Sequence, residues 1–481
     1  MSSTVQSSAK DRILSLLDQN SFVEIGALVT KRSTDFNLNE KEAPADGVIT
    51  GYGLINNKSV YVYSQDASAL NGTIGEMHAK KIVNIYELAL KVGVPVIGLI
   101  DCAGFRLQEA TDALASFGSV YLKQTLASGV IPQITAIFGS CGGGVAISSS
   151  LSDFTFMEET SAKLFVNSPN SIANNYIEKC NTSSATYQSE NGIVDGIGTG
   201  EEIFGKIRDL VTFLPSNNEE DPINECQDDI NRVSEDLQNE LEDPSLVLTE
   251  IADNHKFIEL KKDYAKDMVV GFLSLDGATV GAVANRRALY REGKKEETFE
   301  TVLTTNGCKK AADFINFCDA FQIPIVSFTN TTGYKATMEE EKTIAKATAG
   351  LTYAFANATV PKINIIVGKA YGCAYITMNS KHIGADLVFA YPDAKIGMMD
   401  GKNAVQIMYA EEIKSAKDAV SFINEKANEY EALQSSCLSA AKRGYVDSII
   451  DPKTTRKQLI YGFDMLYTKR EYRPSKKHGT V

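Results

Sequence analysis

The feature that most constrains the fold of this chain is an internal repeat with a constant spacing of 229 residues. Each copy has a proline, a short apolar run and a small-residue turn, followed by a second proline, a second apolar run and a glycine-rich turn. A spacing held over this length indicates two copies of one strand–turn–helix unit. The positions that keep the spacing are Pro95 and Pro324, Gly104 and Gly333, Pro132 and Pro361, and Gly143 and Gly372.

Two predicted strands and a predicted helix come before each repeat. Residues 51–64 and 270–283 each read as a pair of short strands around a tight turn. Their spacing is 220, so nine additional residues must lie between Asn285 and Leu303, where residues 286–297 form a charged excursion. Apolar residues at helical spacing predict helices over 77–92 and 307–321, and a shorter helix over 145–151.

The order of these elements predicts an α/β fold in each half of the chain. Apolar strands that end at glycine turns and alternate with helices are typical of a mainly parallel sheet layered with helices. A chain of 481 residues, 43% of them hydrophobic, is long enough to bury two such cores. We therefore expect two domains of similar architecture.

An acidic segment separates the two predicted domains. Residues 216–243 contain eleven Asp or Glu and one basic residue, Arg232, between Pro215 and Pro244. Such a charge run is most simply a solvated surface connection, partly helical over 228–241. The predicted organisation is a first domain over 1–215, the acidic connection over 216–245 and a second domain over 246–481.

Charge and cysteine usage exclude several classes of protein. A formal net charge of −13 argues against a nucleic-acid binder. The eight cysteines include no CxxC pair and suggest no disulfide framework, which favours a reducing cytosol. The N-terminus lacks a signal-peptide core and no apolar run reaches the length of a membrane span, so a soluble cytoplasmic protein is predicted.

The usual catalytic motifs are also missing. The chain has four histidines and no HExxH, Gly-x-Ser-x-Gly or Walker motif, and no cluster of metal ligands is recognisable, so no metal is predicted. Each histidine is better explained as a core or surface residue than as a catalyst. The chain must therefore take its reactivity from its substrates or from a cofactor carried elsewhere.

The two glycine turns are the candidate chemical sites. Backbone N–H groups at a strand-to-helix turn can stabilise an oxygen that becomes negative during a reaction. Residues 142–144 are all glycine, which lets a substrate approach the backbone, and the following helix would aim its N-terminus at the same point. The alternative is that these glycines only permit tight turns in a packed core. Two turns suggest two oxyanions.

These motifs resemble the carboxyltransferase subunit of biotin-dependent acyl-CoA carboxylases of the propionyl-CoA carboxylase β type, with the α subunits of sodium-pump acyl-CoA decarboxylases as close relatives. The resemblance covers nearly the whole chain. It is carried by residues 11–25, 46–53, 60–66, 127–133 and 153–157 in the first half, and by residues 317–321, 358–362, 369–375 and 473–479 in the second half.

The resemblance implies two tandem crotonase-like domains, with the acyl-CoA bound by the first and biotin by the second. It also implies a homo-hexamer, a trimer of dimers, whose active sites form between the first domain of one subunit and the second domain of another. Biotin would be carried on a separate protein, and the implied partners are that biotin carrier and either a biotin carboxylase or a membrane decarboxylase subunit. The base would be biotin itself, which is consistent with the lack of a recognisable catalytic histidine.

By motif match, the resemblance also assigns the site residues. The N–H groups of Gly143 and Gly144 would hold the thioester oxygen, and those of Cys373 and Ala374 would hold the ureido oxygen of biotin. The predicted substrate-binding residues are Ala103, Gly104, Arg106, Gly142, Gly333, Gly372 and Ile376.

The chain departs from the family pattern at several of these positions. Cys373 replaces a glycine, and Ile376 stands where propionyl-type enzymes usually have Asp. Residues 101–110 and 332–334 differ from the family's turn sequences, and residues 181–189 replace a Glu-Leu-Gly-Gly-Ala stretch. Three functions follow as hypotheses: transfer within a carboxylase, the reverse transfer within a membrane decarboxylase, or a non-catalytic structural subunit of such a complex. The aliphatic Ile376 favours a short-chain acyl-CoA in either catalytic case.

Overall fold

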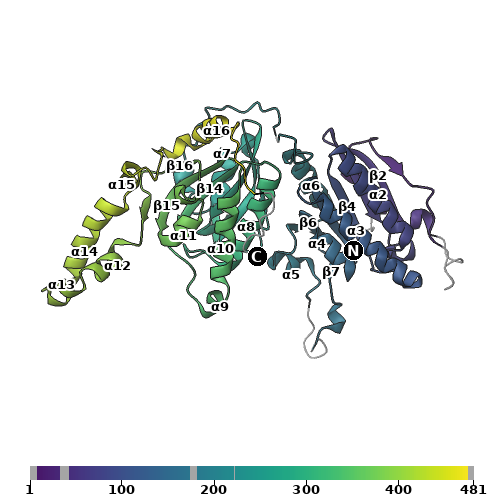
Figure 1. The fold of residues 1–481 in the computed structure, drawn as a ribbon, viewed down its shortest axis with the longest axis horizontal. Coiled ribbons are helices and arrows are strands. Elements are labelled where there is room, and N and C mark those ends of the chain that lie inside the picture. The colour runs from purple at the N-terminus through teal and green to yellow at the C-terminus, as the bar shows by residue number, and fades with distance from the viewer. Residues whose placement is uncertain (1–7, 33–42, 174–180, 222, 475–481) are drawn as a thin grey trace. The chain divides into compact units, whose positions relative to one another are not determined.

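The computed structural model describes residues 8–32, 43–173, 181–221 and 223–474. The chain divides into two compact units, Met1–Asp221 and Pro222–Val481 (Figure 1). Each unit contains one eight-stranded sheet. The division falls after Asp221, so residues 216–221 of the acidic segment belong to the first unit and its remaining described residues belong to the second.

The sheet of the first unit has the strand order β1-β2-β3-β4-β5-β6-β8, and β7 pairs with the end of β5. The pairs β1–β2 and β2–β3 are antiparallel, whereas all pairs from β3 onward are parallel. The strands are β1 (Val23–Ile25), β2 (Val48–Ile55), β3 (Lys58–Gln65), β4 (Val96–Cys102), β5 (Gln133–Gly142), β6 (Phe154–Glu158), β7 (Lys163–Phe165) and β8 (Gly196–Gly198). The helices are α1 (Ala9–Leu16), α2 (Glu76–Val92), α3 (Ala110–Ala127), α4 (Gly144–Ser150), α5 (Ala185–Glu190) and α6 (Gly200–Phe213).

The sheet of the second unit repeats this order as β18-β16-β15-β14-β11-β10-β9, with β17 on the end of β15. Its strands are β9 (Phe257–Leu260), β10 (Met268–Leu275), β11 (Ala278–Asn285), β14 (Ile325–Thr331), β15 (Lys362–Tyr371), β16 (Leu387–Ala390), β17 (Lys395–Gly397) and β18 (Ser448–Ile449). Its helices are α7 (Pro244–Ile251), α8 (Thr305–Ala320), α9 (Met338–Glu341), α10 (Ile344–Asn357), α11 (Gly372–Thr377), α12 (Gly401–Met408), α13 (Ala410–Ser415), α14 (Ala419–Tyr430), α15 (Cys437–Lys442) and α16 (Thr455–Leu466).

The repeat predicted from the sequence is present strand by strand. β14 and β15 begin and end 229 residues after β4 and β5. The predicted helices correspond to α2, α8 and α4 within one or two residues at each end. The predicted hairpins are β2–β3 and β10–β11, whose turns use the left-handed conformation at Asn56 and Asn57 and at Asp276 and Gly277.

A buried lysine marks the equivalent place in α2 and α8. Lys81 donates to the carbonyl oxygens of Ala45 and Val48, and Lys310 donates to those of Lys261 and Tyr264 at 2.9 and 2.8 Å. Burial lowers the pKa of Lys81 to about 8 and that of Lys310 to about 7. Each lysine ties its helix to the loop that precedes the strand pair, so the repeat extends to polar contacts in the core.

The partly helical character expected over 228–241 is limited to one short turn. The only helical turn in this stretch is a 3₁₀ turn, Leu237–Asn239, and the segment instead packs on the second unit. Leu237 is fully buried, and Arg232 donates to the carbonyl oxygens of Glu250 and Ala252 at 2.7 Å each. Contacts with the following helix therefore hold the segment in an irregular path that acidic composition alone did not reveal.

The additional residues after β11 form a charged two-stranded hairpin, β12 (Ala288–Arg291) and β13 (Lys294–Thr298). All residues of β13 are exposed, as expected for an excursion. Arg286 is the exception, because its guanidinium is fully buried and bonds Asp243 and Glu259 at 2.9 Å. The start of the predicted excursion is thus an internal anchor between the acidic segment and the sheet.

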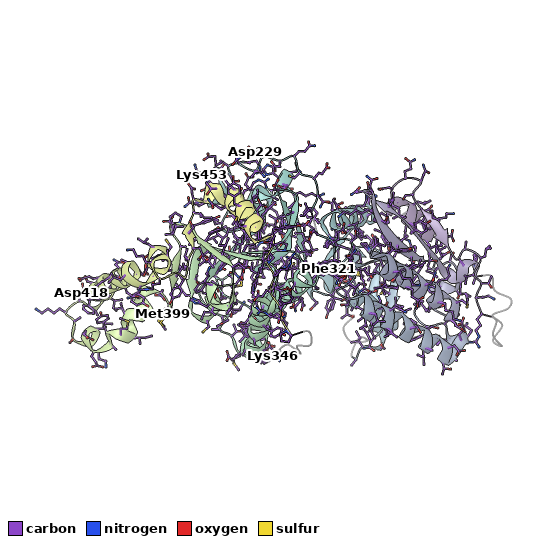
Figure 2. The ribbon with its side chains drawn as sticks, turned by 45° about the horizontal axis from the view of Figure 1, so that its top comes forward. Asp229, Phe321, Lys346, Met399, Asp418 and Lys453 are labelled. Atoms are coloured by element: carbon purple, nitrogen blue, oxygen red, sulfur yellow. The ribbon has the colours of Figure 1, made fainter. Side chains whose placement is uncertain are left out.

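Helices α12, α13 and α14 form an arm that extends away from the sheet of the second unit (Figure 1). Figure 2 shows Phe321, which is fully buried, within the body of this unit, and Asp418 out on the arm. The arm is connected to the sheet through β17 at its start and through a π-helical turn, Glu431–Ser435, at its end. It therefore adds a wall to one side of the sheet rather than a part of the core.

We predict that Asp243→Ala destabilises the protein by about 3–5 kcal/mol, because it leaves the buried Arg286 without one of its two carboxylates. Glu235→Ala, which removes an exposed partner of Lys453 in the same segment, should change stability little. Urea unfolding monitored by circular dichroism gives the free energy of unfolding of both variants. Equal effects of the two variants would contradict this account.

Candidate functional site

The first glycine turn joins β5 to α4. Gly143 has φ +62° and ψ −123°, a conformation that side-chain-bearing residues rarely adopt, and α4 begins at the next residue. Apart from its chain neighbours, no atom of the described residues lies within 4 Å of the position that a Cβ at Gly143 would occupy, whereas one at Gly142 would lie 2.9 Å from the Phe165 ring. The turn is therefore closed on the strand side and open in front of Gly143.

The second turn joins β15 to α11 in the same way. Gly372 has φ +59°, and the exposed Cys373 and the buried Ala374 follow it at the start of the helix. Ile376, one position beyond the buried Tyr375, is 36% exposed. Cys373 presents its side chain outward, so the cysteine that stands in place of glycine leaves the backbone turn intact.

The first N–H groups of a helix have no acceptor within the helix. Apart from bonds internal to helices and strands, no backbone hydrogen bond among the described residues uses the N–H of Gly144, Cys373 or Ala374. The N–H of Gly143 donates to the carbonyl oxygen of Phe165 at 2.9 Å. Three of the four predicted donors are thus available to a ligand, and the fourth is shared with β7.

A second loop lies next to the first turn. The bridge between Ile74 and Phe105 places Ala103 and Gly104 at the end of β4, and a Cβ at Gly104 would lie 3.6 Å from the carbonyl oxygen of Gly142. Ala103 is exposed. The structure therefore brings together Ala103, Gly104, Gly142 and Gly143, which the sequence resemblance predicts as one site.

The corresponding loop of the second unit has the same construction. Leu303 bridges Tyr334, as Ile74 bridges Phe105 229 residues earlier, and the N–H of Leu303 donates to the carbonyl oxygen of Gly333 at 2.9 Å. The hydroxyl of Tyr334 lies beside Thr377 of α11, and burial raises the pKa of this tyrosine. Gly333 and Gly372 are thus held on neighbouring loops.

Arg106, a predicted substrate contact, is buried among neighbouring side chains. Its side chain is 1% exposed, pairs with Asp46 and Glu109, and donates to the carbonyl oxygen of Thr73 at 2.7 Å. Glu109 in turn accepts from the N–H of Glu76 at 2.6 Å, at the start of α2. A charged side chain that follows a turn suggested binding, but the Nη1 and Nη2 groups of Arg106 bond the residues that hold the turn against α2.

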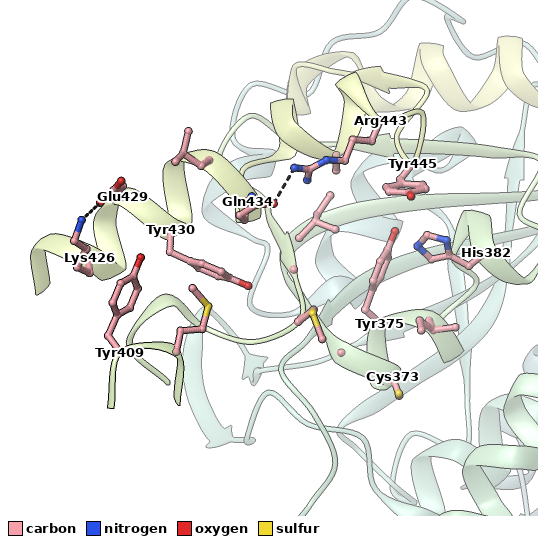
Figure 3. A pocket seen from close by; sticks show the side chains of 18 residues that line it. Cys373, Tyr375, His382, Tyr409, Lys426, Glu429, Tyr430, Gln434, Arg443 and Tyr445 are labelled. Atoms are coloured by element: carbon pink, nitrogen blue, oxygen red, sulfur yellow. Dashed lines mark hydrogen bonds and ion pairs between the residues drawn. The ribbon is translucent and has the colours of Figure 1, made fainter. Parts of the chain in front are cut away.

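A cavity of about 920 Å³ opens beside the second turn, entirely within the second unit (Figure 3). One wall comes from the turn and β17, and the other comes from the arm and α15. The lining residues are Gly372, Cys373, Tyr375, Ile376, His382, Ile396, Gly397, Met398, Met408, Tyr409, Lys426, Glu429, Tyr430, Leu433, Gln434, Ala440, Arg443 and Tyr445.

The cavity combines apolar walls with a few polar groups. Arg443 donates to Gln434 at 2.8 Å, and the rings of Tyr375 and Tyr445 both pack against His382 (Figure 3). The hydroxyl of Tyr375 is buried with no hydrogen-bond partner among the described residues, and burial raises its pKa to about 12. Ligand pockets are typically built in this way, with apolar walls and a few converging polar atoms.

Sequence reasoning found the turn and Ile376 but missed the opposite wall. Met408 and Tyr430 come from the arm, and Leu433 comes from the π-helical turn at its end. The arm carries no motif of its own and lies beside the turn only because of the fold. His78, in contrast, is a satisfied core residue, as expected. Burial lowers its pKa to about 3, and it contacts Asp46 and Gln65.

Neither a metal cluster nor a membrane span accompanies this site. Within the four described ranges, no three His, Cys, Asp or Glu side chains gather as they do around a metal ion. In the same part of the chain, no helix has the length and apolar character needed to cross a bilayer.

Comparison with known proteins decides the family. Residues 6–481 match the model of the carboxyl transferase domain. The chain belongs to the carboxyl transferase family. It is 38% identical to the propionyl-CoA carboxylase carboxyltransferase subunit of Haloferax mediterranei, over 98% of this chain and 93% of that protein. It is 37% identical to the methylmalonyl-CoA decarboxylase subunit alpha of Propionigenium modestum, over 98% and 92% of the two chains.

A solved structure agrees with this assignment. Transcarboxylase 12S superimposes with a TM-score of 0.92 at 34% identity, over 98% of this chain and 92% of that one. That protein was crystallised as a hexamer with methylmalonyl-coenzyme A and methylmalonic acid bound. The family predicted from the sequence, the two crotonase-like domains of this carboxyltransferase and its class of activity are thereby confirmed.

We predict that Tyr375→Phe leaves the stability of the carboxyltransferase unchanged or raises it by up to about 1 kcal/mol, because the hydroxyl removed is buried without a partner. Tyr391→Phe is the matched control. It removes a buried hydrogen bond of 2.8 Å to Thr455 and should cost about 1 kcal/mol. Thermal unfolding of the two variants checks the difference, and an equal loss in both would show that Tyr375 has a partner in solution.

Proposed function

We propose that this carboxyltransferase moves a carboxyl group between carboxybiotin on a separate carrier and the α-carbon of a short-chain acyl-CoA, using one glycine turn for each reactant. The observation that carries the proposal is the duplicated turn. Both units end a central strand in a left-handed glycine and begin a helix whose first N–H groups have no acceptor among the described residues. A reaction with two developing oxyanions requires two such sites.

The first turn is the proposed site of the thioester oxygen. Gly144 offers an N–H with no other acceptor, and Gly143 offers one that is shared with Phe165. The open space in front of Gly143, beside Ala103 and Gly104, allows the thioester to reach the backbone. Removal of one such donor typically costs about 3–4 kcal/mol of transition-state stabilisation.

The second turn is the proposed site of the ureido oxygen of biotin, held by the N–H groups of Cys373 and Ala374. When bound, carboxybiotin supplies the carboxyl group and the base for the α-proton. The cavity beside this turn fits a largely apolar bicyclic group, since Ile376, Ile396 and Met398 line the part nearest to the turn. No side-chain base is then required from the chain itself.

The partners and assembly are part of the same proposal. We infer a homo-hexamer, a trimer of dimers, as supported by the hexamer of transcarboxylase 12S. The carrier of biotin would be a separate cytoplasmic protein, served by a biotin carboxylase. The similar identities to a carboxylase and to a decarboxylase subunit keep the decarboxylating direction, with a membrane subunit as partner, as the second candidate.

We expect the purified chain to carry no covalent biotin and to exchange carboxyl groups between methylmalonyl-CoA and free biotin. Gly143→Ala should abolish the exchange, because its Cβ enters the space of the thioester and strains the backbone at φ +62°. Gly205→Ala, a helical glycine that also has open space around it, should keep full activity. Isotope exchange monitored by mass spectrometry gives the rate of carboxyl exchange for the wild type and the two variants.

Lack of exchange by the wild-type chain, under conditions in which transcarboxylase 12S is active, would favour the non-catalytic structural subunit. A folded Gly143→Ala variant with wild-type exchange would instead contradict the assignment of the first turn.

The exposed aliphatic Ile376 generates a prediction about the acyl group. The α-carbon must reach carboxybiotin for the transfer, so the acyl group would enter the same cavity as biotin, beside Ile376. We expect acetyl-, propionyl- and butyryl-CoA to be preferred over glutaryl-CoA, because Ile376 offers no partner to a second carboxylate. Discrimination among the short acyl groups should be modest, about 1–3 kcal/mol for each methylene. Values of kcat/KM across this series test the expectation, and a preference for glutaryl-CoA would point to Arg443 in the cavity as its partner.

A further inference from the structure

The strands that deliver the two glycine turns share an irregularity at the same place. Between the pairs Ile100–Ile137 and Cys102–Cys141, the single residue Asp101 of β4 lies opposite the three residues 138–140 of β5. Two extra residues thus sit on β5 just before the first turn. Such a bulge bends a strand and is common beside active sites.

The second unit has the same bulge. Between the pairs Thr329–Ile366 and Thr331–Ala370, Asn330 of β14 lies opposite residues 367–369 of β15. Beyond the bulge, β5 pairs with β7 and β15 pairs with β17. The bulge therefore redirects each central strand to a new neighbour immediately before it reaches Gly143 or Gly372.

One side chain fills each bulge. Asp101 Oδ1 accepts from the N–H of Ser140 at 3.2 Å, and Asn330 Oδ1 accepts from the N–H of Lys369 at 3.0 Å. These are N–H groups that the interrupted ladder leaves without a strand partner, and a buried N–H without an acceptor is costly. In each unit, a side-chain oxygen from the equivalent strand, β4 or β14, thus replaces the missing ladder bond.

A glycine makes room for that side chain in both cases. A Cβ at Gly139 would lie 2.0 Å from Asp101 Oδ1, and one at Gly368 would lie 2.7 Å from Asn330 Oδ1. Neither glycine has a positive φ, so the backbone conformation does not require it. A glycine is required because any Cβ would occupy the space of the side-chain oxygen.

The two positions differ in charge. Asp101 is held by Arg12 of α1 through an ion pair of 3.1 Å, with both side chains almost fully buried. Asn330 is neutral and 8% exposed, and its own N–H donates to Asn285 at 3.0 Å. Since a carboxylate and an amide serve equally, the shared requirement is the oxygen acceptor rather than the charge.

We propose that Asp101 and Asn330 are positioning residues of the carboxyl transfer, each of which fixes the direction of the strand that carries one oxyanion-binding turn. This inference rests on the proposed function of the turns. A displacement of the reacting groups by about 1 Å can cost a hundredfold in rate, so loss of the bridging oxygen should affect turnover more than folding.

The test in the second unit compares Asn330→Leu, which removes the oxygen at similar size, with Asn330→Asp, which keeps it. In the carboxyl-exchange assay, Asn330→Leu should lower kcat by roughly tenfold to a hundredfold. The KM for the acyl-CoA should stay close to the wild-type value, because the first turn is unaffected. Asn330→Asp should retain most of the wild-type kcat.

The test in the first unit separates position from stability. Asp101→Asn keeps the oxygen but leaves Arg12 buried without its charge partner, so it should lower the melting temperature and preserve kcat. The double variant Arg12→Met, Asp101→Leu removes the ion pair together with the oxygen. It should lower kcat/KM for the acyl-CoA while its melting temperature stays above that of Asp101→Asn.

The outcomes are distinguishable from failure of the proposed function. Absence of exchange in the wild-type protein would reject the proposed function itself. An active wild-type protein together with a folded Asn330→Leu variant of unchanged kcat would reject the positioning role. A parallel loss of kcat and melting temperature in all four variants would reject it as well, since a purely structural role predicts that pattern.

Discussion

The site proposed for this carboxyltransferase depends on a backbone conformation that only glycine adopts readily. Gly143 and Gly372 turn the chain from a central parallel strand into a short helix at positive φ. The N–H groups of Gly144, Cys373 and Ala374 have no acceptor outside their own helices among the described residues. Everything else near the two turns can be understood as support for them. The bulges before the turns, the bridges from Ile74 and Leu303 and the buried pairs of Arg106 hold these peptide groups in place.

Much of this arrangement could be predicted from the sequence because it is repeated at a fixed spacing. Prolines before apolar runs and glycines after them located β4, β5, β14 and β15, and the change in spacing located the hairpin β12–β13. Single side chains were harder to interpret. Arg106 and Arg286 stand among polar residues in the sequence, yet both are buried, because their acceptors come from distant segments that no local pattern indicates.

The acidic segment and the cavity show the same limit. A run of carboxylates predicted a solvated, partly helical surface connection, but the path of residues 223–243 is set by Leu237 in the core and by Arg232 on the backbone of the following helix. The cavity wall opposite the second turn is contributed by residues about thirty to seventy positions later, on an arm without a motif. Tertiary contacts of this kind leave only weak traces in composition and periodicity.

The arm also links binding to conformation. One wall of the cavity stands on the sheet and the other on α12, α14 and the π-helical turn, so a molecule that fills the cavity touches both at once. By mass action, such a ligand stabilises the arrangement of the arm in which the two walls lie at the right separation. Under the proposed function, binding of biotin at the second turn is thereby coupled to the position of the arm, and the free energy of binding includes whatever is needed to hold the arm in place.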